Sequence, residues 1–158
     1  MEDNLLLNKT LLAARLERLH PEATPRWGSM TAQHMIEHLA EVVSFSNGKI
    51  QAELAIPYEK AERAKVRMLA PEWEMPKEFT ASFMPAESLP ELKFSSLHEA
   101  IQALFSEMAE FYSFFARNPD ATPLHPYFSN LDQGEWLTAH HKHFKHHFEQ
   151  FGLLDDTQ

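Results

Sequence analysis

The chain has 158 residues, of which 44% are hydrophobic and 23% charged, so it has the composition of one ordinary globular domain. Its formal net charge of -9 argues against a nucleic-acid partner and an anionic membrane surface, because both require a basic face. Cysteine is absent, which excludes disulfides, thiolate metal ligands and a cysteine nucleophile. We therefore expect a single domain over residues 1–158, in which nitrogen and oxygen atoms hold any metal.

The amino-terminal segment has the pattern of a helix and not of a signal peptide. It has only a three-leucine apolar run behind two acidic residues, so no signal peptide is expected, and no later stretch is long enough to span a bilayer. Cytoplasm is the default location. Leucines at helical spacing predict a first helix over Leu5–Leu19, which ends before Pro21.

A second helix is expected after the proline connection. Ser29 or Thr31 can cap its start, and it should run to about Ser46 and end at Asn47-Gly48, a typical helix-end pair. Its apolar face carries His38 at one edge, with Glu41 farther out on the same side.

Residues 50–95 are the least regular part of the sequence. Pro57–Leu69 has the pattern of a charged helix. Four prolines and scattered aromatic residues between Ala70 and Pro90 indicate a long irregular crossover. Connections of that length are often lids or interface loops, and the sequence does not choose between the two.

Two further helices complete the pattern. Ser96 and Glu99 have the form of a capping box and open a long, aromatic-rich helix to about Arg117. Asp132 and Glu135 can cap the last helix in the same way. Four amphipathic helices without a strand series predict an all-α helical bundle, with a long crossover between its second and third helices.

The last helix contains a concentration of histidines. Five of them fall within eight residues: His140, His141, His143, His146 and His147. At about 100° per residue, His143 and His147 sit together at the edge of the apolar stripe with His140 beside them. The same geometry places His141 on the opposite edge and His146 on the solvent-facing side.

A metal site in a bundle needs ligands from at least two helices. His143 and His147 at i,i+4 from the last helix, with His38 from the second, make a three-imidazole site for a zinc-like ion. The fourth tetrahedral position then stays open for water or substrate. His140 can replace His143 geometrically, and Glu41 can be a fourth ligand, a partner of a ligand, or simply solvated.

The histidines also have simpler interpretations. A histidine run is often a surface feature, and His38 alone fits a hydrogen-bonded core residue. No glycine-rich phosphate loop, nucleophile elbow or paired-carboxylate motif stands out.

Two segments resemble the DinB/YfiT-like superfamily, and within it the DUF1569 group. They are RLERLHPEATPRWGSMTAQHMIEHLAE (Arg15 to Glu41) and HPYFSNLDQGEWLTAHHKHFKHHFEQFG (His125 to Gly152), about a third of the chain together. In the second, His-Pro, Glu-Trp and His-x-x-His-His-x-x-Gln-Phe-Gly recur at similar spacing. One departure is Ser129, where the group usually has glycine, at a position that should shape the turn.

The resemblance implies a DinB-like four-helix bundle, often a homodimer, with a divalent metal on one histidine of the second helix and two of the last. Those positions are His38, His143 and His147. It also implies a metal-dependent hydrolase or thiol-dependent transferase acting on a small molecule, with zinc or nickel as the metal. His125 is then the best candidate to line the pocket, and Glu41 the next. The alternative is a non-catalytic metal-binding or structural protein that works through oligomer or partner contacts.

Overall fold

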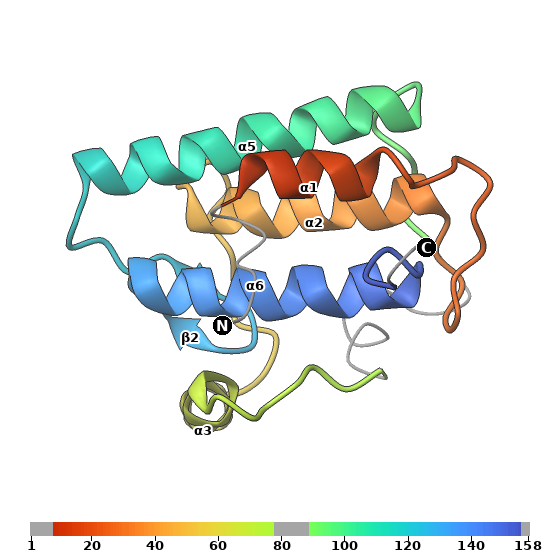
Figure 1. The fold of residues 1–158 in the computed structure, drawn as a ribbon. Helices are drawn as coiled ribbons and strands as arrows, with labels where there is room; N and C mark the ends of the chain where they lie inside the picture. Colours follow the sequence, from red (N-terminus) through yellow and green to blue (C-terminus); the bar gives the residue numbers. More distant parts are fainter. Residues whose placement is uncertain (1–7, 78–88, 156–158) are drawn as a thin grey trace.

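The computed structural model describes residues 8–77 and 89–155, and this part of the chain is mostly helical (Figure 1). Its helices are α1 (Lys9–Leu16), α2 (Ala32–Ser46), α3 (Tyr58–Leu69), α5 (Leu97–Arg117) and α6 (Gln133–Gln150). Two short strands, β1 (Leu124–His125) and β2 (Ser129–Asn130), pair antiparallel. The predicted helical class is confirmed, whereas the short hairpin before α6 was not predicted.

The helices fall into two orientations. In Figure 1 the axes of α1, α2, α5 and α6 run in nearly the same direction, and α3 is seen end-on, so it crosses them. α2 packs along α5 and also contacts α6, while α3 contacts α6 and β2. α2 and α6, which carry the predicted metal ligands, are therefore neighbours in space.

The ends of α2 follow the sequence prediction. The Thr31 side chain accepts a hydrogen bond from the backbone N–H of His34 at 3.1 Å, so Thr31 and not Ser29 is the cap. Asn47 ends the helix, and Gly48 follows in the left-handed region with φ 83°. This capping fixes where α2 begins and therefore the direction in which His38 points.

The first helix is shorter than expected. α1 ends at Leu16 instead of Leu19, because Arg18 and Leu19 donate to the carbonyls of Arg15 and Leu16 in tight i→i+3 turns that replace the helical pattern. The predicted start at residues 5–7 lies outside the described residues.

The caps of α5 and α6 are those that the sequence predicts. Ser96 accepts from the backbone N–H of Glu99 at the start of α5. Asp132 and Glu135 form a reciprocal capping box at the start of α6, with distances of 2.9 Å in both directions.

The charged helix predicted over residues 57–69 is present as α3. Its carboxyl-terminal carbonyls are bound from α6, because the ammonium group of Lys142 donates to the carbonyls of Met68 and Ala70 at 2.7 Å each. Residues 70–77 continue without regular structure beside α6, as the predicted crossover requires. The remainder of that crossover, residues 78–88, lies outside the described residues.

One hydrophobic core joins the helices. Trp136 and Phe144 of α6 are fully buried in it, together with Phe111 of α5 and Met35 of α2. The indole N–H of Trp136 donates to the carbonyl of Pro123 at 3.0 Å, so its one polar atom is satisfied. Among the described helices, none combines the length and the apolar character that a membrane span requires.

Candidate metal centre

Three buried histidines meet between α2 and α6. His38 and His143 are each 4% exposed and His147 is 0% exposed. One nitrogen from each ring lies within 4.8 Å of the other two. The structure thus brings together the three residues that the sequence selected, although 105 positions separate His38 from His143.

The distances within this group suit a small cation. The Nε2 atom of His143 is 3.0 Å from Nε2 of His38 and 3.1 Å from Nε2 of His147. Two nitrogens that bind a tetrahedral zinc ion at 2.0–2.1 Å are themselves about 3.3 Å apart. The rings meet edge to face, with centroids between 4.7 and 5.1 Å apart, so their nitrogens converge without stacking of the rings.

A glutamine that the sequence interpretation did not assign sets the tautomer of His147. The amide nitrogen of Gln150 donates to the carbonyl of Trp27 at 2.8 Å, so its oxygen must face His147. That oxygen lies 2.7 Å from Nδ1 of His147, which therefore carries the ring proton. Nε2 of His147 then presents a lone pair to the group, the form in which imidazole binds a metal.

The spacing of Gln150 was available as a signal. It follows His147 by three residues on α6, and i,i+3 neighbours on a helix face each other. Its contact with Trp27 was not available, because that residue belongs to the connection before α2.

Burial keeps the three rings neutral. It lowers the pKa of His38 to about 4, with His146 adding a smaller effect of the same sign. Burial, and after it the neighbouring histidines, hold the pKa values of His143 and His147 well below the usual range for histidine. At neutral pH all three therefore have the protonation state that metal binding requires.

His140 does not join the three histidines. Its Nε2 lies 2.7 Å from the hydroxyl oxygen of Ser46, and that hydroxyl donates its own proton to the carbonyl of Val43 at 2.6 Å. His140 must then donate from Nε2, which leaves a lone pair on Nδ1. Nδ1 is buried and has no hydrogen-bond partner among residues 8–77 and 89–155. The sequence alternative in which His140 replaces His143 is not the arrangement found.

His125 is buried beside the centre, whereas Glu41 is not. The ring of His125 lies between Phe128 and Trp136, with centroids 4.5 and 5.1 Å away, and its Nδ1 accepts from the backbone N–H of Tyr127. Burial lowers its pKa to about 3. Glu41 is exposed on α2, so the structure gives it no place among the buried histidines.

The prediction that His146 faces solvent is wrong. His146 is only 5% exposed, because Trp27 and Met75 cover that side of α6. Its ring lies 5.5 Å from that of Trp27 and makes a hydrogen bond to the backbone of Met75. A helical projection of α6 alone could not predict this burial, because Trp27 and Met75 belong to other segments of the chain. His141, predicted on the opposite edge, is partly exposed.

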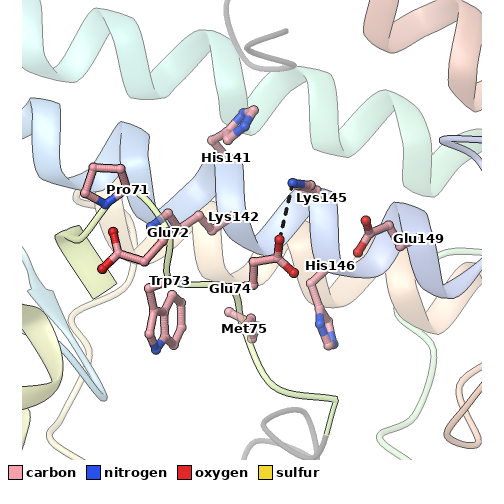
Figure 2. Close-up of a pocket in the computed structure, with 10 residues that line it drawn as sticks. All are labelled: Pro71, Glu72, Trp73, Glu74, Met75, His141, Lys142, Lys145, His146 and Glu149. Atoms are coloured by element: carbon pink, nitrogen blue, oxygen red, sulfur yellow. Dashed lines mark ion pairs between the residues drawn. The ribbon is translucent and has the colours of Figure 1, made fainter. Parts of the chain in front are cut away.

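A surface cleft and a small inner cavity lie next to the centre. The cleft, called here the α6 cleft, has a volume of about 330 Å³ and lies between residues 71–75 and α6 (Figure 2). Figure 2 shows its lining residues, which are Pro71, Glu72, Trp73, Glu74, Met75, His141, Lys142, Lys145, His146 and Glu149. The inner cavity has a volume of about 10 Å³ and is lined by Val42, Met75, His125, Phe128, Ala139, His140 and His143.

Comparison with known proteins assigns the chain to no family. No protein-family model, no curated protein and no solved structure matches the chain.

Proposed function

We propose that this protein is a metal-dependent enzyme whose divalent ion, zinc or nickel, binds to His38, His143 and His147. The convergence of three buried ring nitrogens within 4.8 Å is the observation that carries the proposal. The reaction class that we propose is hydrolysis or thiol-dependent group transfer on a small molecule, with one coordination position left to the substrate.

The number of ligands supports a catalytic site. Within the described residues the group holds three histidines and no carboxylate, and the chain has no cysteine. Catalytic zinc sites usually have three protein ligands, whereas structural sites usually have four. A divalent ion bound here supplies Lewis acidity to a substrate oxygen or sulfur.

The protein's own residues prepare that position. Gln150 holds the proton of His147 on Nδ1, so the lone pair stays on Nε2. The three histidines are themselves at most 4% exposed, so water is excluded from them and electrostatic interactions there are strengthened.

For the fold, we propose a DinB-like four-helix bundle made of α1, α2, α5 and α6, which assembles as a homodimer. The common direction of these four axes supports the bundle (Figure 1). The turn before α6 also supports the resemblance, because Ser129, at the position where the DUF1569 group usually has glycine, has a positive φ of 65°. Sedimentation equilibrium tests the dimer.

One observation favours a second candidate, a non-catalytic metal-binding protein. The three histidines are almost inaccessible, and the cavity beside them has room for about one water molecule. A purely structural ion fits such a closed setting. The two candidates differ in whether an added ligand reaches the bound ion.

Elemental analysis of untagged protein, purified without chelator, tests the metal centre. We expect about one equivalent of zinc or nickel in the wild type and its loss in the His38→Ala His147→Ala double variant. His98→Ala, which removes an exposed histidine of α5, is the matched control and should keep the metal. Undiminished metal in the double variant, or none in the wild type, would defeat the proposal.

A further inference from the structure

One residue is common to the walls of the α6 cleft and of the inner cavity. Met75 lines both of them. The cleft opens to the surface, and its volume of about 330 Å³ lies within the usual range of small-molecule sites. The inner cavity borders His143, one of the three proposed ligands. A path from solvent through the cleft and the inner cavity to the metal centre would therefore pass Met75.

The backbone and the side chain of Met75 are held differently. The ring of His146 hydrogen-bonds the backbone of Met75, which fixes this residue against α6. Methionine has three rotatable side-chain bonds and a polarizable sulfur, so its side chain changes conformation at low cost. Figure 2 shows Met75 near His146 in the cleft. An anchored backbone with an adaptable side chain suits a residue that yields to a ligand.

His140, which lines the inner cavity, has a strong hydrogen-bond acceptor without a donor among the described residues. Nδ1 of His140 carries a lone pair, because Ser46 holds the ring proton on Nε2, and this nitrogen has no partner in the described structure. His140 is 1% exposed, so bulk water does not satisfy the nitrogen. A buried acceptor left unpaired is costly, and a donor placed beside it is correspondingly favoured.

We propose that the α6 cleft is the substrate-binding site of the metal centre, and that the substrate passes Met75 and places an N–H or O–H group against Nδ1 of His140. This inference rests on the metal centre proposed above. It commits to a class of ligand: a small molecule whose inner end is an amine, an amide, an azole or an alcohol. An unprotonated oxyanion is disfavoured there, since it would bring its own lone pairs against that of His140.

The walls of the cleft fit a ligand without a large net charge. Lys145 lies 3.9 Å from Glu74, and the ammonium group of Lys142 lies 5.5 Å from the ring centre of Trp73. Charges of both signs are therefore present, and neither sign dominates the walls. Trp73 adds a flat apolar surface that suits the body of a small organic molecule.

A matched pair of probes tests the hydrogen-bond preference. Imidazole and 1-methylimidazole offer the same metal-binding nitrogen, but only imidazole has an N–H group to donate. With cobalt(II) in the centre, the visible spectrum reports binding of either probe. We expect the wild type to bind imidazole roughly tenfold more tightly than 1-methylimidazole, the ratio that one buried hydrogen bond provides.

Two variants isolate His140. In His140→Phe the acceptor is absent, and the affinity ratio should fall toward one. In Ser46→Ala the ring is retained but its proton is no longer held on Nε2, so the ratio should fall as well, even if His140→Phe does not fold. His98→Phe is the control and should keep the wild-type ratio. An unchanged ratio in Ser46→Ala, or equal affinities in the wild type, would overturn the assignment of His140.

Association rates test the route past Met75. In stopped-flow mixing with cobalt-loaded protein, Met75→Ala should bind imidazole several-fold faster than the wild type, because the side chain between cleft and cavity is shortened. Met75→Leu conserves the volume and should stay close to the wild type. Equal rates in Met75→Ala and the wild type would overturn the route.

These outcomes separate the inference from the proposed function. Protein that binds no cobalt refutes the metal centre itself. Protein that binds cobalt but shows no spectral response to either probe supports the non-catalytic candidate and overturns the substrate site. Protein that binds cobalt and both probes, without an effect of Met75 or His140, keeps the metal centre and refutes only the inference.

Discussion

His147 donates from Nδ1 to the side-chain oxygen of Gln150 at 2.7 Å, and the amide of Gln150 is itself fixed by the carbonyl of Trp27. Removing such a partner of a metal-binding histidine typically costs 10–100-fold in metal affinity. We expect Gln150→Leu to weaken zinc binding by about that factor, measured by competition with a chromophoric chelator. Gln150→Glu keeps an acceptor and should retain more affinity than Gln150→Leu. Gln102→Leu on the exposed face of α5 should have no effect.

His125 should make the protein sensitive to acid. Burial lowers its pKa from 6.5 to about 3, so below pH 6.5 the unfolded chain binds a proton that the folded chain does not. The free energy of unfolding is therefore unaffected by this ring above pH 6.5. Below that pH it falls by about 1.4 kcal/mol per pH unit, until pH reaches about 3. His125→Asn keeps an acceptor for the N–H of Tyr127 and should flatten the pH dependence by about that slope.

Urea denaturation of the metal-free protein at pH 7, 6 and 5 measures this effect. The control is His98→Asn on the exposed face of α5, which should follow the wild-type curve. Parallel curves for His125→Asn and the wild type would contradict the prediction.

A substitution at Phe144 tests the hydrophobic core around α6. Its side chain is 0% exposed, and Phe144→Ala should lower the free energy of unfolding by about 3–5 kcal/mol, as is usual for a buried phenylalanine. Phe94 is 37% exposed, and Phe94→Ala should cost far less. Similar losses in the two variants, measured by urea denaturation, would show that the burial of α6 is not as described.

Ser129 tests the turn before α6. It has a positive φ of 65° and is 0% exposed. Valine is strongly disfavoured in that region, so Ser129→Val should destabilise the fold by about 1–2 kcal/mol. Ser129→Gly removes the backbone strain of the positive φ but gives the unfolded chain more conformational freedom. These effects oppose each other, so the free energy of unfolding should change by less than about 1 kcal/mol. Thermal unfolding of the two variants, compared with the wild type, measures the difference.

Local sequence patterns predicted the starts of α2, α5 and α6 and the three converging histidines. Thr31, Ser96 and Asp132 cap their helices through contacts that span three residues, so they are visible in sequence. His143 and His147 follow from the helical period alone. The assignment of His38 as the third ligand also assumed that α2 packs beside α6. The amphipathic pattern of α2 supported that assumption.

The burial of His146 and the orientation of His140 were missed because both depend on contacts between distant segments. His146 is buried by Trp27 and Met75, and His140 is turned toward Ser46 of α2. Nothing in the period of α6 reports what covers its outer side. The two-residue strands are likewise too short to produce an alternating pattern, so the hairpin has no periodic signal.

The separation of His38 from His143 and His147 has a consequence for how the chain folds. An unfolded chain can offer an ion His143 and His147 together as an i,i+4 pair, and binding there favours the helical turn that holds both rings. The third ligand arrives when α2 docks onto α6, so full affinity and native docking are reached in the same step. The ion should therefore slow unfolding more than it speeds folding, and chelator should act on the lifetime of the native state.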